Sequence, residues 1–409
     1  NGAFGIEFFV LIEHATYLAG PAVVLSLFLC GLITMFTLLS YCELGAAISR
    51  VGGEYTFAKA AFGGFTSFLT GWMRWMSCVA TIALSAIGLA QFISYFYPIN
   101  IPLAAAIFIL IFSFASVKGT KELDIITVVM FISIFALLVI LGVKQIMELG
   151  SLEPFKSLDV FMPKGLNGVL AGIMYVSSMF VGVRAIIAGS PQMKNPEKNV
   201  PKSILVSIIT LIVIYCSVAF VIVSVVPLNA ELNQPILTYA AERIMGPIGG
   251  LLITIAGILA AIMSLTTAMS VQRSIVYGLS RDGYLPSVIS PDRKLGHYLS
   301  VLMGSTLAIL LAITGLIVFV GYIGGLASLM VFAFVNLSLI KLRRKMPRLD
   351  RPFMAPLYPY TPIAGIVFSI LLILFVERSA LLIGLEFIII AIIIYHLKMV
   401  GYHRLRLAI

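Results

Sequence analysis

Long apolar runs without a single charge restrict what this chain can fold into. Examples run from Ala15 to Cys42, from Ile125 to Val143, from Ile204 to Ala230 and from Ile244 to Gln272. Each reaches the ~17–25 residues that a helix needs to cross the hydrocarbon core of a bilayer. Charged residues make up 11% of the 409 residues, far below the share in a soluble domain. The sequence therefore predicts an all-α polytopic membrane protein.

Other classes fit the composition less well. A membrane β-barrel would alternate apolar and polar residues in short strands, whereas these runs are continuous. The net charge of +10 comes from short loops between apolar runs, which favours a topology signal over nucleic-acid binding. Cys30, Cys42, Cys78 and Cys216 lie in apolar segments without metal-ligand spacing, so we expect neither a metal site nor a cofactor.

Proline, glycine and charged residues divide the apolar runs into twelve expected elements, most of them full spans. They cover residues 3–14, 21–45, 65–96, 101–117, 124–147, 166–192, 203–227, 247–280, 298–319, 322–341, 361–377 and 380–398. The first is only half a span and begins abruptly at Asn1, so we expect a preceding segment. If successive spans cross the membrane in alternating directions, most basic residues fall on one side of it. Basic loops are typical of the cytoplasmic side, which predicts a cytoplasmic loop at 49–65 and a short cytoplasmic tail at 399–409.

Glycines interrupt two of the expected spans. One interruption is at Asn1–Gly5 and the other at Ser177–Arg184, which contains Gly182. Broken spans of this kind, five elements apart, indicate a five-plus-five inverted repeat with discontinuous helices 1 and 6. The repeats would be 1–147 and 166–341, followed by two further helices at 361–398. Glycines used only for close helix packing are the competing interpretation.

Four motifs resemble the amino acid–polyamine–organocation permease family when taken together. They are ELGAAISRVGGEY at Glu43–Tyr55, KNPEKNVP at Lys194–Pro201, SRDGYLP at Ser280–Pro286, and RPF with PLYP between Arg351 and Pro359. The resemblance implies a LeuT-type fold of ten core helices plus two. It also implies a multi-pass protein of the cell membrane that acts as a proton-linked symporter or an exchanger of amino acids or amines.

A broken helix exposes free N–H groups and free carbonyl groups, which can bind the carboxylate and the ammonium group of an amino acid. Free N–H groups around Asn1, Gly2 and Ala3 would bind the carboxylate. Carbonyls near Met179 to Val181, beside Gly182, would bind the ammonium group. The resemblance implies a side-chain pocket lined by Ser77, Cys78, Ile82, Ser178 and Val181. It also makes Phe180 the nearest candidate for an aromatic gate, with plain packing as the alternative.

Several charges lie inside or beside the expected spans. Arg184 costs roughly 2.5–3.5 kcal/mol near the bilayer centre, so it should face a wet cavity, an anion or a buried carboxylate. Glu7 is the second unusual charge, either as a coupling group or as the partner of Arg184. The resemblance implies that Glu43, Arg273 and Asp282 close a cytoplasmic gate. We expect Arg74, beside Trp72 and Trp75, to reach toward the membrane interface.

The substrate and the coupling ion are open at this stage. Small, uncharged pocket residues favour neutral amino acids, and Glu7 makes cationic amino acids or polyamines the alternative. Residues 130–134 lack the lysine that occupies a cation site in some proton-coupled relatives, so proton coupling, exchange and facilitated passage all stay open. The histidines are scattered, which disfavours an enzyme. The sequence contains no filter-like motif that would indicate a channel. An amino acid sensor built on the same scaffold is a further alternative. The oligomeric state is not predicted.

Overall fold

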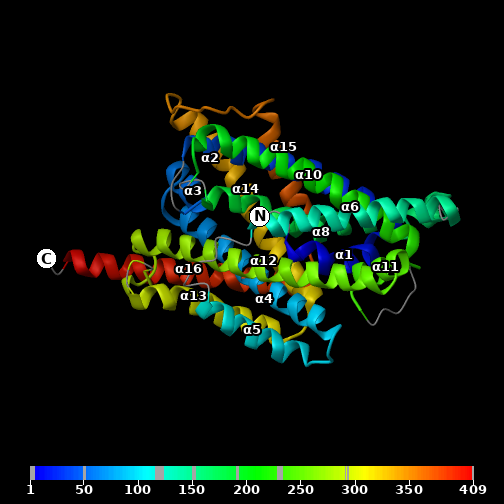
Figure 1. The fold of residues 1–409 in the computed structure, drawn as a ribbon. Helices are drawn as coiled ribbons and strands as arrows, with labels where there is room; N and C mark the ends of the chain where they lie inside the picture. The colour runs from blue at the N-terminus through cyan, green and yellow to red at the C-terminus, as the bar shows by residue number, and fades with distance from the viewer. Residues whose placement is uncertain are drawn as a thin grey trace.

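Most of the long helices run along one direction of the molecule (Figure 1). The computed structural model describes residues 5–48, 52–115, 124–149, 153–189, 193–227, 234–290, 292 and 294–407, and the regular structure in these ranges is helical. The longer helices are α1 (Ile6–Ala19), α2 (Val23–Ala47), α4 (Gly64–Ser94), α5 (Ile101–Ala115), α6 (Asp124–Leu149), α8 (Gly165–Val176), α10 (Pro196–Val225), α12 (Pro247–Arg281), α13 (Lys294–Ile313), α14 (Ile317–Lys345), α15 (Tyr360–Ile373) and α16 (Arg378–Leu407). The shorter ones are α3 (Glu54–Ala61), α7 (Leu158–Phe161), α9 (Ala185–Gly189), α11 (Ile236–Met245) and the 3₁₀ segments η1 (Gly20–Ala22), η2 (Glu153–Phe155), η3 (Ser177–Arg184) and η5 (Ser287–Ile289).

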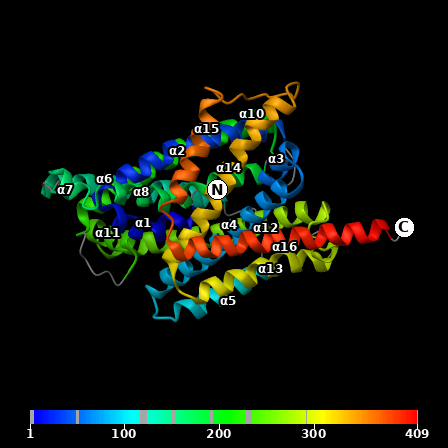
Figure 2. The same cartoon turned by 180° about the vertical axis from the view of Figure 1, so that it is seen from behind.

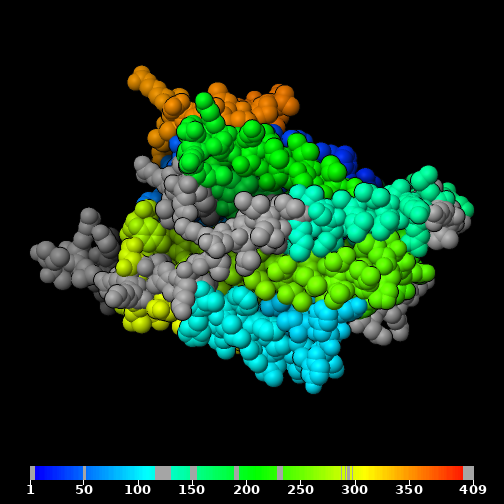
Figure 3. All heavy atoms as spheres, in the orientation of Figure 1, coloured from blue at the N-terminus to red at the C-terminus, as the bar shows by residue number. Residues whose placement is uncertain are grey.

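The lateral surface of the bundle is apolar. On the face shown in Figure 3, α10 lies above α12, and α5 lies below. These helices expose large apolar side chains, among them Val213 of α10, Ile255 of α12 and Ile111 of α5. Among the described residues, eight helical stretches are long and apolar enough to cross a membrane, while the apolar parts of α5, α13 and α15 are shorter. The structure therefore confirms the prediction of an all-helical integral membrane protein.

Helix α4 is the centre of the bundle. In its most apolar stretch 83% of the residues are buried, whereas only 22% are buried in α16. Helices α12 and α14 pack along α4, while α5 lies at the lower edge of the bundle in Figures 1 and 2 and α16 lies at the front in Figure 2. A polar contact also joins the inner helices, because the Asn336 amide of α14 bonds to Ser40 (2.7 Å) and Thr37 (2.9 Å) of α2. Such bonds hold helices together where lipid offers no hydrophobic driving force.

A sharp turn at Gly20-Pro21 separates α1 from α2. Gly20 has φ 63° and ψ −147°, which favours glycine, and Pro21 cannot donate a hydrogen bond to continue α1. The ring of Phe8 in α1 stacks on the ring of Tyr215, with 4.1 Å between their centroids. The Phe180 ring packs on the same tyrosine, with 5.6 Å between centroids. The Phe180 ring also approaches Gly31 of α2. The start of α1 and the middle of α2 therefore lie on either side of the Phe180–Tyr215 pair.

The stretch expected to be broken near Ser177 changes its winding there. The α-helix ends at Val176, the chain continues as the 3₁₀ helix η3, and α9 follows from Ala185. The Ser177 and Ser178 hydroxyls donate to the carbonyls of Met174 (2.6 Å) and Tyr175 (3.2 Å), which lie in the last turn of α8. The interruption is thus a change from α to 3₁₀ geometry, with two carbonyls of the last α-turn also bonded by serine hydroxyls.

Replacing Gly168 with alanine tests the close packing of α1 on α8. A Cβ at this position would lie 2.7 Å from the backbone oxygen of Leu18, which cannot yield without moving α1. We expect Gly168→Ala to lower the unfolding stability in detergent by about 1–3 kcal/mol, the usual cost of overpacking. Gly324→Ala is the control, because its Cβ would lie at an ordinary 3.4 Å from Ala80. An unchanged midpoint for Gly168→Ala would contradict the close approach.

Candidate functional site

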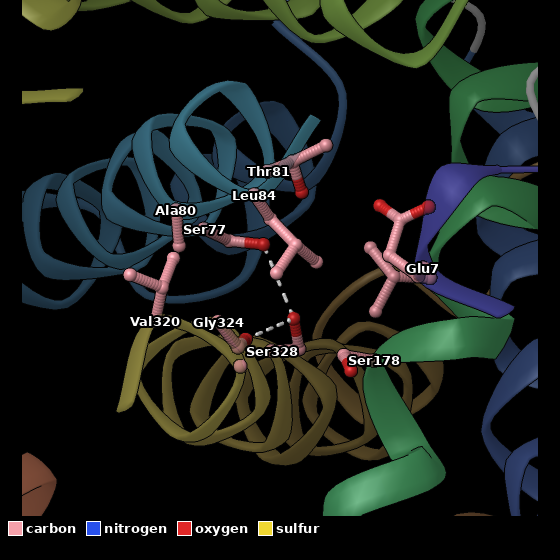
Figure 4. Close-up of a pocket in the computed structure, with 11 residues that line it drawn as sticks. Glu7, Ser77, Ala80, Thr81, Leu84, Ser178, Val320, Gly324 and Ser328 are labelled. Carbon is pink, nitrogen blue, oxygen red and sulfur yellow. Dashed lines mark hydrogen bonds between the residues drawn. The ribbon is translucent and has the colours of Figure 1, made fainter. Parts of the chain in front are cut away.

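Two adjoining hollows lie where α1 begins and where α8 gives way to η3. The first is the smaller of the two. Glu7, Thr81 and Val181 line both of them. The first is also lined by Ser77, Ala80, Leu84, Ser178, Val320, Gly321, Gly324 and Ser328 (Figure 4), and the second by Arg74, Cys78, Gly182, Ala185, Ser264, Thr267, Ala268 and Val271. The walls therefore come from α1, α4, η3, α12 and α14.

The 3₁₀ winding of η3 decides which of its side chains belong to the site. A 3₁₀ helix has three residues per turn, so side chains three apart lie in line. Ser178, Val181 and Arg184 fall on one such line. Ser178 and Val181 line the hollows, and Arg184 bonds to serines of the same walls. Three residues in a row are thereby aimed at α4 and α14.

Arg184 is fully buried, and its contacts are now defined. Its Nη2 donates to Ser77 (3.2 Å) and Ser328 (3.0 Å), and its Nε donates to the Val181 carbonyl (3.4 Å). Its guanidinium lies 5.0 Å from the centre of the Phe332 ring, and its Nη1 is 4.0 Å from a carboxylate oxygen of Glu54. The partner that the sequence left open is thus the first residue of α3.

Glu54 is the site residue that sequence reasoning missed. Its carboxylate lies 3.1 Å from Arg74 Nε and accepts a hydrogen bond from the Tyr41 hydroxyl (3.2 Å). It stands inside a motif expected to form a cytoplasmic loop, yet only 3% of it is exposed. Nothing in its immediate sequence distinguishes Glu54 from a solvated loop glutamate. The available signal was the presence of two arginines inside the expected spans, because such buried charges call for a carboxylate partner.

The prediction for Arg74 was wrong. Only 5% of this arginine is exposed, and it pairs with Glu54 instead of reaching the membrane interface. Its neighbours Trp72 and Trp75 are buried as well, and both pack against Phe387 of α16. Because α16 covers this part of α4, the tryptophans have no interface to anchor.

The buried cluster carries one surplus positive charge. Arg74 and Arg184 are both cationic, and Glu54 supplies one negative charge between them. Arg74 Nε is close to Glu54 but not aligned for a hydrogen bond, and Arg184 Nη1 has no hydrogen-bond partner either. Buried charges are costly unless they are compensated. The charge of Glu7, which lines both hollows, therefore decides whether the site is neutral.

The cluster occupies the full hydrogen-bonding capacity of Ser77 and Ser328, two serines that line the first hollow. Ser328 donates its proton to the Gly324 carbonyl (2.7 Å), so Ser77 must be the donor in the 3.1 Å contact between the two hydroxyls. Ser77 then accepts from Arg184 and, at 3.5 Å, from Arg74. Both serines are saturated, and the polar groups left for a ligand in the first hollow are those of Glu7, Thr81 and Ser178 (Figure 4).

Two predicted binding residues do not line either hollow. Phe180 is fully buried beside Tyr215 and Gly31, where it packs α2, η3 and α10 together. Met179 is 1% exposed and also lies in the core. Only the backbone of these two residues could serve a ligand. Ser77, Ser178 and Val181 line the first hollow, and Cys78 and Gly182 line the second.

The start of α1 provides a further polar wall. The backbone N–H of Ile6 donates to the Ser264 hydroxyl of α12 at 2.9 Å. Glu7 follows in the first turn, where a negative charge is favoured by the helix dipole. Asn1, Gly2 and Ala3, which we expected to bind the carboxylate, lie outside the described residues.

The three predicted gate residues do not form one cluster. Glu43 binds Arg343 (2.6 and 2.9 Å) and Arg351 (3.2 Å), which anchors the segment after α14. Asp282 binds Tyr55 and, at 2.6 Å, Lys59, both of α3. Arg273 is half buried and bonds to Ser270.

The Asp282 contact fixes the far end of α3. Burial raises the pKa of the Asp282 carboxyl, but hydrogen bonds from Lys59 and Tyr55 and the charge of Lys59 outweigh that effect and leave its pKa below the ordinary value. Asp282 therefore stays ionised at neutral pH. Together with Glu54, this contact clamps both ends of α3 to the bundle.

A third and larger hollow lies beside the other half of α1. It holds about 1050 Å³ of empty space. Its walls include Phe9, Glu13 and His14 of α1, Gln91 and Ser94 of α4, and Ile317 of α14. Phe9 and Val10 of this lining lie within one helical turn of Glu7 along α1.

The Glu54 cluster can be tested by its charge balance. We expect Glu54→Gln to destabilise the protein by about 3–5 kcal/mol, the usual cost of breaking a buried pair. Glu54→Gln with Arg74→Gln restores the original net charge and should lose less than the single variant. The measurement is chemical unfolding in detergent, with the exposed Glu377→Gln as control. Equal losses for the single and double variants would disprove the pairing.

Comparison with known proteins agrees with this architecture over nearly the whole chain. A family model described as amino acid permease matches residues 1–396. A branched-chain amino acid permease of Bacillus subtilis is 25% identical and covers 96% of this chain and 89% of its own length. A methylthioribose transporter of Bacillus subtilis is 29% identical over 85% of this chain and 80% of its own. The gamma-aminobutyric acid permease of Escherichia coli is 24% identical over 84% and 78%.

Proposed function

This chain belongs to the amino acid permease family, and from that premise we propose that it is a secondary transporter of neutral amino acids in the plasma membrane. The observation that carries the proposal is the pair of hollows between α1, α4, η3, α12 and α14. They lie inside the bundle and are lined by small, hydroxyl and charged side chains. A permease needs such an internal, polar and closable site.

The proposed topology has twelve crossings. It counts α1 and α2 separately and adds the shorter helices α5, α13 and α15 to the long apolar ones. Residues 1–147 and 166–341 would form the two inverted repeats, with α15 and α16 added and the C-terminus in the cytoplasm. In support, Glu7 of α1 and Ser178, at the point where α8 gives way to η3, line the same hollow inside the bundle.

Charge favours a zwitterionic substrate over a cationic one. Arg74 and Arg184 outnumber Glu54 beside the hollows, so whenever Glu7 is protonated the site attracts a carboxylate and repels a second positive charge. The carboxylate would lie toward Arg74 and the start of α1. The ammonium group would lie toward Ser178 and the carbonyls of η3. Cationic amino acids and polyamines, the alternative raised by Glu7, fit this field less well.

Transport by purified protein in liposomes tests the function. We expect saturable uptake of labelled leucine and alanine, and weak or no uptake of arginine and putrescine. Liposomes without protein are the control. Uptake limited to arginine or putrescine would contradict the neutral substrate. Flux without saturation would indicate a channel, and tight binding without flux would indicate a sensor.

A bulky residue at Val181 should block the site. Val181 lines both hollows, so Val181→Phe fills them without adding charge, and we expect uptake to fall by about tenfold or more through loss of binding. The matched control is Val213→Phe, because Val213 is 60% exposed on the outer face of α10. Normal uptake by folded Val181→Phe protein would place the substrate elsewhere.

A further inference from the structure

The first hollow has a polar end and an apolar end. In Figure 4, Glu7 and Ser178 lie on one side of it, while Ala80, Val320 and Gly324 lie together on the other. Ala80 belongs to α4, and Val320 and Gly324 belong to α14. None of these three residues has a polar side chain. A ligand with charged groups at one end and an apolar group at the other therefore matches this hollow in one orientation.

Two serines beside the apolar end do not make it polar. Ser77 and Ser328 contact each other at 3.1 Å, and Arg184 donates to both of them. Ser328 also donates to the Gly324 carbonyl at 2.7 Å. Since neither hydroxyl keeps a free proton, a polar group that entered this end would lose its water without gaining a donor from these serines. An apolar group loses nothing there.

Gly324 has open space beside it. A methyl group built on Gly324 would lie 3.4 Å from the methyl group of Ala80, which is an ordinary van der Waals contact. Gly324 is also only partly buried, although the two residues before it and the two after it are buried. By contrast, a methyl group on Gly321 or Gly325 would lie only 3.0 Å from a neighbouring side chain. The gap between Ala80 and Gly324 is thus just wide enough for one methyl group.

We propose that the gap between Ala80 and Gly324 is the side-chain subsite of this transporter and selects aliphatic amino acids by size. When the charged groups of an amino acid lie near Glu7 and Ser178, its side chain points toward this gap. The gap holds a terminal methyl group of a side chain as long as that of leucine, whereas the methyl group of alanine does not reach it. This inference rests on the proposed function, because it requires an amino acid in the first hollow.

Gly324→Ala fills the gap without adding charge, and it keeps the backbone carbonyl that binds Ser328. We expect the half-saturating concentration of leucine for uptake into liposomes to rise about tenfold or more, the usual effect of one methyl group in an apolar pocket. The half-saturating concentration of alanine should stay nearly the same. The ratio of these two concentrations does not depend on how much active protein each preparation contains.

Two further variants complete the test. Gly325→Ala is the matched control, because it makes the same substitution one residue later and Gly325 lines neither inner hollow. It should leave the ratio of leucine to alanine unchanged. Ala80→Gly combined with Gly324→Ala moves the methyl group from α4 to α14 and reopens the gap, so we expect it to regain most of the lost leucine affinity. The unfolding midpoint in detergent checks that each variant is folded.

The outcomes distinguish this inference from the proposed function. An equal loss of leucine and alanine affinity in folded Gly324→Ala protein would overturn the subsite, because a filled gap affects only the longer side chain. A double variant with no more leucine affinity than Gly324→Ala alone would overturn it as well. Absence of saturable leucine and alanine uptake by the natural protein would instead contradict the proposed function itself.

Discussion

One buried carboxylate shared by two guanidinium groups holds together the parts of the bundle that surround the hollows. Glu54 brings α3 against Arg74 of α4 and Arg184 of η3. Inside a bundle surrounded by lipid, charged groups can be stabilised only by one another and by nearby polar groups. Helix α3 must therefore insert among the spanning helices, although its sequence is that of a polar loop. Asp282 then fixes its other end through Lys59.

The same cluster determines which wall residues are available to a ligand. Arg184 bonds to Ser77 and Ser328, and the bond of Ser328 to Gly324 leaves neither hydroxyl with a free proton. These serines thus serve the arginine and not the substrate. Recognition falls to the helix ends and to Glu7, Thr81 and Ser178, so binding and the internal charge balance cannot be separated.

Hydropathy and glycine position predicted the long helices well, because lipid imposes length and apolarity on a single segment. The expected 247–280 and 65–96 correspond closely to α12 (Pro247–Arg281) and α4 (Gly64–Ser94). The short helices α3 and α11 were not predicted, since neither is long enough to span. The pairing of Glu54 with Arg74 was also missed, because it depends on how a loop folds back between spans. Trp72 and Trp75 indicated an interface only because their cover, α16, lies far away in the sequence.

The winding of η3 explains why the residues of one short segment have different roles. In a 3₁₀ helix, Ser178, Val181 and Arg184 lie in one row toward the hollows, while Phe180 turns toward Tyr215. In an α-helix each residue turns 100° instead of 120°, so Arg184 would be displaced by roughly 120° from the row of Ser178. The contacts of Arg184 with Ser77 and Ser328 would then be lost. The position of the buried charge therefore depends on the local winding of η3.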